Sequence, residues 1–183
     1  MERGRIRTIG FLGERGMKGG NLIDPIENQI TDMKIYIDTS VIGGCFDVEF
    51  EEWSLKLFEK FRLGKETAMI ADLTEQELEF APKQVREKLQ DIPDPNRLDV
   101  LITDEIIRLA ESYIKDGALS PKFFNDALHI AAATIHNADV LASWNFKHIV
   151  NLQRIRLYNS VNLKKGYRLI EIRTPREILE NDE

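Results

Sequence analysis

Hydrophobic residues after Met33 fall into two patterns that alternate along the chain. Short apolar runs bounded by polar or glycine-containing segments are typical of buried β-strands. They predict strands over residues 34–38, 67–71, 100–103, 139–143 and 168–173. The first of these runs ends on a carboxylate, Asp38, a position that becomes important once the chemistry is considered.

The longer stretches between these runs carry apolar side chains at the 3.6-residue spacing of a helix. Residues 104–116 show this spacing clearly, with one face formed by Ile106, Ile107, Ala110, Tyr113 and Ile114. Gly117 predicts the end of this helix, and Ser120 with Pro121 predicts the start of the next. Further helices are expected over residues 51–63, 73–81, 82–90 and 121–136.

Strands separated by helices favour a parallel sheet with helices on both of its faces. The chain has 183 residues, a length that fits one folded domain with an additional tail. Residues 1–32 predict that tail, because five glycines cluster at residues 10–20 among charged residues, without a sustained apolar period. We therefore expect a flexible leader over 1–32 and a folded domain over 33–183, with the hypothesis that Met33 is the true start and that the leader is not native. Sequencing the N-terminus of the native protein tests this expectation.

Cysteine content and hydropathy exclude several classes of protein. The single cysteine, Cys45, rules out a disulfide framework and any zinc site built from several cysteines. It also fits a reducing compartment, so we expect a cytoplasmic location. No apolar run approaches the roughly 20 residues that span a bilayer, and no membrane association is expected.

Charge is distributed unevenly along the chain. The net charge of −6 by itself argues against a nucleic-acid partner. Residues 147–173, however, carry seven basic side chains against one acidic, while residues 34–146 carry 12 basic against 21 acidic. A basic segment on an acidic body can form a local anion-binding face. The equally weighted alternative is a solvated surface of strand and loop.

Polar side chains follow several of the predicted strands. Asp38 ends the first strand, Glu77 lies shortly after the second, Asp126 lies early in the helix after Pro121, and Asn145 follows the fourth strand. Ligands of open α/β sheets gather at the carboxyl ends of the strands, where these groups would meet. Clustered carboxylates repel one another unless a cation compensates them, and Mg²⁺ or Mn²⁺ prefers such oxygen ligands.

Each of these residues also has a purely structural interpretation. Asp38 would cap the next helical turn, and Asp126 would lie on an exposed helix face. Thr74 and Glu77 fit a capping box, in which case Glu75 or Glu79 becomes the acidic candidate. Asn145 would only form a turn. The prediction of a cation site therefore depends on the four residues together, each near a strand end, and not on any one of them.

Four segments resemble the acidic motifs of PIN domains. They are IYIDTSV at residues 35–41, IADLTEQEL at 70–78, NDALHIAAA at 125–133 and LASWNF at 141–146. The resemblance extends from Met33 to about Pro175, and its third motif is the most specific. It implies an α/β fold, namely a three-layer α/β/α sandwich with a central parallel sheet.

The same resemblance implies a metal-dependent endoribonuclease, similar to the toxin half of VapBC-type toxin–antitoxin pairs. By that resemblance Asp38 and Asp126 hold Mg²⁺ or Mn²⁺, and Glu77 completes the cluster directly or through water. Asn145 binds a metal-coordinated water or helps to form a second, weaker site. Ser40 and Ser143 would orient these groups, and Lys147 would contact substrate phosphate. The implied partners are RNA, a small antitoxin protein and a second copy of the chain in a homodimer.

Asn145 departs from the family pattern, which usually has Asp at this position. Loss of one negative charge should weaken a second metal ion more than the first, so two tightly bound Mn²⁺ ions per chain would contradict our expectation. A catalytically weak or inactive RNA- or protein-binding module is the alternative function. A phosphatase with Asp38 as nucleophile is disfavoured, because Ser40 stands where its second Asp would be.

Other side chains are expected to be structural. His129 lies one helical turn after Asp126, and we expect it to be a hydrogen-bonded histidine rather than a metal ligand. The aromatic residues Phe46, Phe50 and Trp53 are expected in the core or at a subunit interface rather than as platforms for base stacking. Trp144 is expected to pack behind the site, with stacking on a base as the alternative.

Overall fold

The central element of the fold is a parallel sheet. The computed structural model describes residues 33–180, and the leader predicted over 1–32 lies outside the described residues. Within the described part, five strands pair in the order β3-β2-β1-β4-β5. They are β1 (Lys34–Ile37), β2 (Thr67–Ala71), β3 (Arg97–Val100), β4 (Val140–Ala142) and β5 (Ile172–Arg173).

The strand order places a topological switch point between β1 and β4. From β1 the chain builds the sheet outward through β2 and β3, and then returns to add β4 and β5 on the other side. Ile37 of β1 pairs with Ala142 of β4, so Asp38 and Ser143 leave the sheet side by side. Crevices at such points are where open α/β sheets bind ligands.

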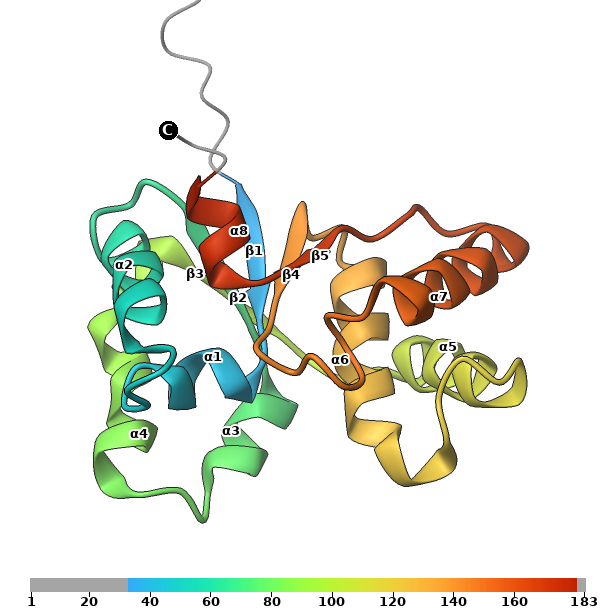
Figure 1. Cartoon of the computed structure of the whole chain (residues 1–183), viewed down its shortest axis with the longest axis horizontal. Helices are drawn as coiled ribbons and strands as arrows, with labels where there is room; N and C mark the ends of the chain where they lie inside the picture. Colours follow the sequence, from blue (N-terminus) through green and yellow to red (C-terminus); the bar gives the residue numbers. More distant parts are fainter. Residues whose placement is uncertain (1–32, 181–183) are drawn as a thin grey trace, which may run out of the picture. The chain divides into compact units, whose positions relative to one another are not determined.

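Helices cover both faces of the sheet, as Figure 1 shows. One face is covered by α1 (Thr39–Gly44), α2 (Glu51–Arg62), α4 (Lys83–Glu87) and α8 (Pro175–Glu180). The other face is covered by α5 (Asp104–Lys115), α6 (Phe124–Ile135) and α7 (Leu152–Lys165). The seven-residue α3 (Asp72–Leu78) follows β2 directly. This arrangement confirms the predicted three-layer α/β/α sandwich with a central parallel sheet.

Successive side chains of the central strands enter opposite layers. Tyr36 of β1 belongs to the core under α5, α6 and α7, whereas Ile35 and Ile37 belong to the core under α1, α2 and α8. All three are fully buried. Burial on both faces explains why the central strands read as continuous apolar runs rather than as an alternation of apolar and polar residues.

The edge strands differ from their predicted positions. The third strand lies at residues 97–100 rather than 100–103, because β3 pairs only with β2 and leaves Leu98 and Asp99 exposed. The fifth strand comprises only residues 172–173 instead of 168–173. The side chain of Asn159 hydrogen-bonds both backbone groups of Ile170, at 2.8 Å and 3.1 Å, and so replaces strand pairing there.

The basic segment contains a helix that the hydrophobic pattern did not predict. Residues 152–165 form α7, with the Asn151 side chain capping its first turn and Gly166 in the left-handed conformation at its end. Only Tyr158, Val161 and Asn162 are buried in it, so its apolar stripe is narrow. The alternative interpretation of this segment as strand and loop is therefore wrong. The short α1 and α8 were not predicted either.

The helix that carries Asp126 begins later than expected. Residues 121–123 form a 3₁₀ turn, the α-helix starts at Phe124, and Ser120 makes no capping hydrogen bond. Further 3₁₀ turns occupy Lys88–Asp91 and Asp94–Asn96. Over residues 33–180, no helix combines the length and the apolar character needed to cross a membrane.

Candidate functional site

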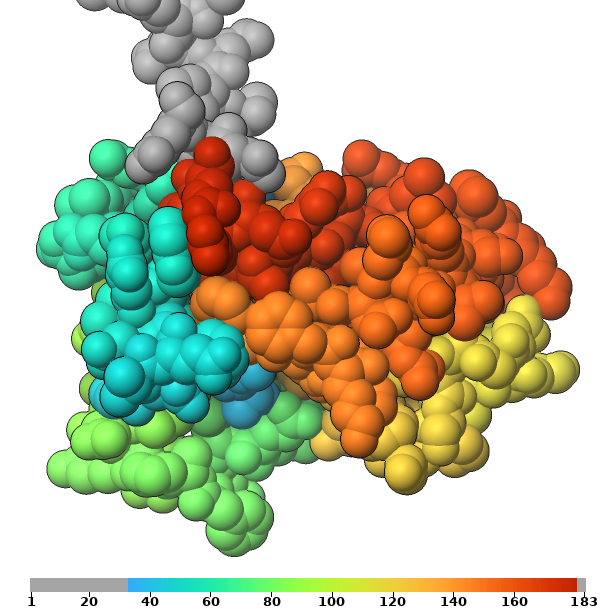
Figure 2. All heavy atoms as spheres, in the orientation of Figure 1, coloured from blue at the N-terminus to red at the C-terminus, as the bar shows by residue number. Residues whose placement is uncertain are grey.

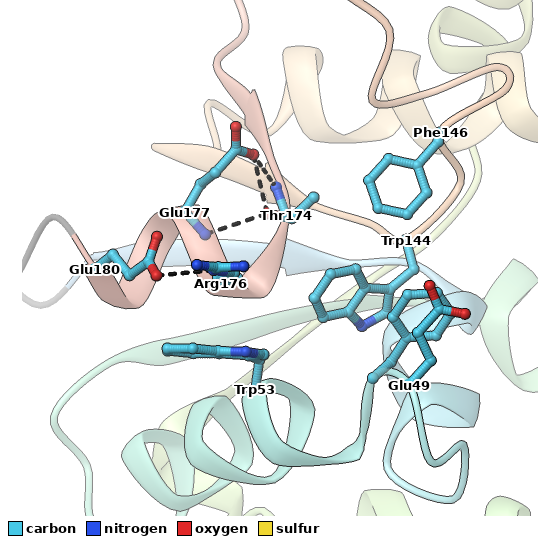
Figure 3. Close-up of a pocket in the computed structure, with 9 residues that line it drawn as sticks. Glu49, Trp53, Trp144, Phe146, Thr174, Arg176, Glu177 and Glu180 are labelled. Atoms are coloured by element: carbon cyan, nitrogen blue, oxygen red, sulfur yellow. Dashed lines mark hydrogen bonds and ion pairs between the residues drawn. The ribbon is translucent and has the colours of Figure 1, made fainter.

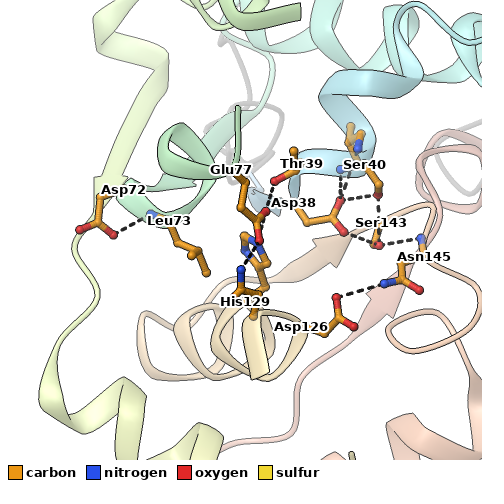
Figure 4. A network of polar contacts seen from close by, with 12 residues as sticks. Asp38, Thr39, Ser40, Asp72, Leu73, Glu77, Asp126, His129, Ser143 and Asn145 are labelled. Atoms are coloured by element: carbon orange, nitrogen blue, oxygen red, sulfur yellow. Dashed lines mark hydrogen bonds and ion pairs between the residues drawn. The ribbon is translucent and has the colours of Figure 1, made fainter. Parts of the chain in front are cut away.

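Polar side chains from four segments meet at the switch point of the sheet (Figure 4). Asp38 follows β1, Glu77 lies in α3, Asp126 lies in the first turn of α6, and Asn145 lies in the loop after β4. The structure thus brings the four sequence-predicted residues into one neighbourhood. The adjacency of β1 and β4 and the packing of α3 and α6 beside them produce this convergence.

Asp38 is the most buried of the carboxylates, with 4% of its surface exposed. Its Oδ1 accepts hydrogen bonds from the backbone N–H groups of Ser40 and Val41 and from Ser40 Oγ, at 3.1, 3.3 and 2.6 Å. Its Oδ2 accepts from Ser143 Oγ at 2.7 Å. Asp38 therefore caps α1 and faces the site at once. Burial raises the pKa of Asp38, and the hydroxyls of Ser40 and Ser143 oppose that rise.

Glu77 is held by neutral donors and a histidine. Its carboxylate accepts hydrogen bonds from Thr39 Oγ1, from Asn125 Nδ2 at 2.9 Å and from His129 Nε2 at 3.1 Å. Burial acts to raise the pKa of Glu77, but His129 and the other donors outweigh it and lower this pKa to about 2. Glu77 is therefore ionised and fully engaged.

The capping-box interpretation of Glu77 is wrong. The helix α3 begins at Asp72, with Ala71 at the N-cap position, so Thr74 lies inside the helix. Glu77 is consequently free of any capping role and points toward α1 and α6 (Figure 4).

His129 connects Glu77 to the sheet. Its Nδ1 lies 2.9 Å from the hydroxyl of Tyr36, and its ring is 2% exposed. Because the Glu77 carboxylate can only accept, His129 Nε2 donates to it. Burial raises the pKa of Tyr36 well above its usual value, which keeps the phenol a donor. His129 is thus the hydrogen-bonded histidine that the sequence predicted.

Asp126 is half-buried, and its negative charge is poorly compensated. Its Oδ1 accepts one hydrogen bond, from Asn145 Nδ2 at 3.1 Å. Burial, together with the charges of Asp38 and Glu77, raises the pKa of Asp126 from 3.8 to about 6, although His129 opposes this. Such a shift is typical of a carboxylate in an anionic cluster that a cation would stabilise.

Asn145 forms a turn and belongs to the site as well. Its Oδ1 accepts from the backbone N–H of His148 at 3.0 Å. Since that backbone group can only donate, the orientation of the amide is fixed and its NH₂ group is directed at Asp126. The amide therefore supplies a hydrogen-bond donor to Asp126, which a carboxylate at this position would not.

The donor atoms at this site suit a hard divalent cation, but they do not form a complete ligand set. Among residues 33–180, no three His, Cys, Asp or Glu side chains are arranged as a metal-binding group. Mg²⁺ retains several waters and is commonly held by one or two carboxylates. Asp38 and Asp126 supply two such carboxylates, although Asp38 accepts four hydrogen bonds and Glu77 three, so either would share its oxygens with donors already present.

A group of cations lies on the Asp126 side of the site. Lys122 and Asp126 line the same small cavity, and the ring of Phe123 lies against that of His148, with centroids 3.6 Å apart and planes tilted by 31°. Burial lowers the pKa of His148, and the positive charges of Arg154, Lys147 and Lys122 lower it further. These three cations therefore converge near His148, and Lys147 itself is exposed.

Three residues that bind Glu77 were not singled out as its partners from the sequence. They are Thr39, Asn125 and His129. Thr39 and Asn125 are direct chain neighbours of Asp38 and Asp126, so their position beside the acidic residues was the available signal. Their shared contact with Glu77 depends on how α3 packs, which the sequence pattern does not specify.

Comparison with known proteins supports the fold. No family model matches the chain, and no curated protein matches its sequence. Among solved structures, the chain is similar to a chain in the crystal structure of VapBC2 from Rickettsia felis bound to a DNA fragment from their promoter. The match has a TM-score of 0.50 and 13% sequence identity, and covers 78% of this chain and 98% of that chain. At this identity the likeness establishes a shared α/β fold.

Proposed function

We propose that this protein is a metal-dependent endoribonuclease that hydrolyses RNA phosphodiester bonds. The observation that supports this most strongly is the convergence of Asp38 and Asp126 at the switch point between β1 and β4, where Asp126 has a pKa of about 6. A half-buried carboxylate beside two others is repelled by them when it is ionised, and a bound cation would relieve that repulsion. The similarity of the fold to a chain of the VapBC2 structure is the second support.

In this proposal Asp38 and Asp126 hold one Mg²⁺ or Mn²⁺. The cation, when bound, would activate water and offset charge on the scissile phosphate. Ser40 and Ser143 keep the Asp38 carboxylate in one orientation through their short hydrogen bonds. Asn145 fixes Asp126 from the other side.

Glu77 has a supporting role in this proposal. Its hydrogen bonds to Thr39 and to Asn125 join the segments directly adjacent to Asp38 and Asp126. It therefore positions the two metal-binding carboxylates relative to each other and acts on the cation through water rather than as a direct ligand. Lys147, exposed in the loop after Asn145, would contact substrate phosphate.

The proposal also assigns the protein a biological role and protein partners. The neighbouring structure is of VapBC2 with a fragment of promoter DNA, and we infer by analogy that this chain is the toxin of a type II toxin–antitoxin pair. A small antitoxin protein and a homodimeric assembly would then be its protein partners. Cys45 is a buried free thiol, in keeping with a cytoplasmic location.

The second candidate function is an RNA-binding module with weak or absent catalysis. The neutral Asn145 favours it, because an amide at this position reduces the number of carboxylates available to a metal. This alternative requires RNA binding to survive the loss of both Asp38 and Asp126.

The decisive experiment compares cleavage of a mixed pool of single-stranded and structured RNA with Mn²⁺, with Mg²⁺ and with EDTA. Wild type, freed of any co-purifying partner, is tested beside Asp126→Asn and the control Asp94→Asn, which alters an exposed aspartate of a 3₁₀ turn. Loss of an outer-shell partner alone typically costs a metal site about 10- to 100-fold, so we expect Asp126→Asn to cost more than ~100-fold.

The proposal expects wild type and Asp94→Asn to cleave only with metal present. No cleavage by folded wild type under any condition would favour the RNA-binding module. Equal cleavage by wild type and Asp126→Asn would show that the site assignment is wrong or that a contaminating nuclease is responsible.

A further inference from the structure

We propose that an aromatic groove beside the carboxylates binds an unpaired nucleobase of the substrate, next to the phosphate that is cleaved. This inference rests on the proposed function and adds to it a preference for single-stranded RNA. The groove is formed by Phe50 and Trp53 of the α2 segment, by Trp144 and Phe146 of the loop after β4, and by α8.

The groove is a cavity of about 530 Å³ (Figure 3). Phe50 and Trp144 stack with ring centroids 4.6 Å apart, and Phe146 lies 6.2 Å from Trp144 and 6.3 Å from Phe50. On the opposite side, the Arg176 guanidinium lies 5.6 Å from the ring of Trp53. Figure 2 shows the three elements around this cavity, α2, the loop after β4 and α8, meeting on one face of the molecule.

The rings differ in how much of their surface remains open. Trp144 is only 9% exposed and donates through Nε1 to Ser54 Oγ at 2.9 Å, so it forms a fixed wall. Trp144 is therefore packed in the core and also lines the groove. Phe146, by contrast, is 51% exposed. An exposed phenyl ring beside a rigid pair of stacked rings provides a surface on which a flat base can stack.

One loop connects the groove to the catalytic residues. Ser143 donates to Asp38, the backbone N–H of Trp144 donates to Ser40 Oγ at 2.8 Å, and Asn145 donates to Asp126. The aromatic residues Trp144 and Phe146 directly precede and follow Asn145 in the chain. A base in the groove and a phosphate at Asp38 and Asp126 therefore belong to neighbouring parts of one ligand.

The charges divide the surface into a base-binding side and a phosphate-binding side. The groove is lined by Glu49, Glu177 and Glu180 against a single cation, Arg176, which pairs with Glu180 at 2.8 Å. Such a lining repels phosphate but can accept hydrogen bonds from base amino groups. The cations Lys122, Lys147 and Arg154 gather instead near His148, where they can bind the backbone. This division favours a nucleotide chain as the ligand.

The test uses intrinsic fluorescence, because both tryptophans of the chain line the groove. Full-length protein carrying Asp126→Asn, which prevents cleavage, is titrated with a single-stranded oligoribonucleotide in Mg²⁺. The same length of abasic oligonucleotide and an oligolysine peptide serve as comparison ligands. We expect the oligoribonucleotide to quench the fluorescence and the abasic chain and the peptide to leave it nearly unchanged.

Phe146→Ala, added to this background, removes the stacking surface, and we expect the dissociation constant to rise about 5- to 100-fold. The control Phe80→Ala removes a phenyl ring that is 91% exposed and does not line the groove, and it should bind as before. Phe146→Tyr keeps an aromatic ring and should restore binding. Recovery by Tyr shows that a loss in the Ala variant arises from the missing ring rather than from misfolding.

Three results would overturn the inference. They are equal affinity of the Phe146→Ala and Phe80→Ala proteins, equal quenching by the abasic chain, and quenching by oligolysine alone, which would mark the groove as a docking surface for a basic peptide. Cleavage by the otherwise wild-type chain is measured in parallel. If the chain cleaves RNA but Phe146→Ala leaves RNA binding unchanged, only this inference is contradicted. If the groove binds bases but the chain does not cleave RNA, the proposed nuclease is contradicted and the groove assignment stands.

Discussion

At the residue scale, neighbouring donors give the three carboxylates of the site different protonation behaviour. Asp38 receives four hydrogen bonds, Glu77 receives three, and Asp126 receives one. The pKa of Glu77 is lowered to about 2 and that of Asp126 is raised to about 6. Asp126 is therefore the carboxylate whose ionised form gains most from a cation.

Replacing Asp126 by Asn should stabilise the metal-free protein at neutral pH. The folded pKa of Asp126 is raised from 3.8 to about 6, so its ionisation destabilises the fold above about pH 6 and has no such effect below about pH 4. The shift corresponds to roughly 3 kcal/mol, which exposure to solvent at this half-buried site reduces to about 1–2 kcal/mol. Urea unfolding in EDTA at pH 7.5 and pH 4 measures the difference.

The increase in unfolding free energy caused by Asp126→Asn should disappear at pH 4. Asp94→Asn should have the unfolding free energy of wild type at both pH values. A variant less stable than wild type at pH 7.5 would show that Asp126 is already compensated without a cation.

Glu77→Gln should have the opposite effect. The folded pKa of Glu77 is lowered from 4.5 to about 2, so its ionised form stabilises the fold above about pH 4.5, and this stabilisation is lost as the pH falls toward 2. We expect Glu77→Gln to lose about 1–2 kcal/mol of unfolding free energy at pH 7, after the same allowance for solvent. The deficit should narrow in urea unfolding at pH 3.

The matched control for this variant is Glu79→Gln, an exposed residue of the same segment. If Glu77→Gln lowers the unfolding free energy as much at pH 3 as at pH 7, the charge of Glu77 does not account for its contribution to stability.

The residue types of the site were predictable from the sequence, while their partners were not. Asp38, Asp126 and Asn145 follow or precede buried elements that are recognisable from the hydrophobic pattern. The hydrogen bonds from Thr39 and Asn125 to Glu77 join segments separated by 38 and 48 residues. Such contacts depend on the packing of α3 against α1 and α6, which a one-dimensional pattern does not contain.

At the element scale, the close approach of α1 to α2 and to the loop after β4 holds Trp144 in place. A side chain at Gly44 would bring its Cβ within 2.6 Å of Ser54 Oγ and 2.9 Å of the Trp144 ring. These two groups are hydrogen-bonded to each other. Glycine is thus needed at position 44 because there is no room for a Cβ atom, and not because of the backbone conformation.

Gly44→Ala should therefore destabilise the protein by about 1–3 kcal/mol, the usual cost of overpacking a core position. Gly43→Ala is the matched control, because a Cβ at Gly43 meets no atom within 4 Å. Alanine in that helical position should stabilise the fold by up to about 1 kcal/mol. Thermal unfolding monitored by tryptophan fluorescence compares the two variants. Equal effects of the two substitutions would contradict the packing assigned to Gly44.

Elements were predictable where burial is strong on one or both sides. The central strands β1 and β2 and the amphipathic α5 lie within one residue of their expected bounds. Where burial is partial the pattern gave less information, as at β3, β5 and α7. In α7 the N-cap Asn151 and the terminal Gly166 were better signals than hydrophobic spacing.

At the scale of the whole domain, described over residues 33–180, strand order decides where chemistry can occur. The alternation of strands and helices predicted a parallel sheet, but not the order β3-β2-β1-β4-β5. That order makes β1 and β4 neighbours and so brings Asp38 beside Ser143. The positions of the polar residues after predicted strands pointed to this edge of the sheet, and the motifs that resemble PIN domains pointed to the same residues.

The central claim is that Asp38 and Asp126 together hold one divalent cation, and Mn²⁺ binding stoichiometry tests it most directly. Equilibrium dialysis with Mn²⁺ at pH 7.5 is applied to wild type, Asp126→Asn and Asp94→Asn. We expect about one tightly bound ion per wild-type and Asp94→Asn chain, and none on Asp126→Asn, because two carboxylates with waters suffice for one such ion. Two tightly bound ions on wild type, no binding at all, or undiminished binding by Asp126→Asn would contradict the claim.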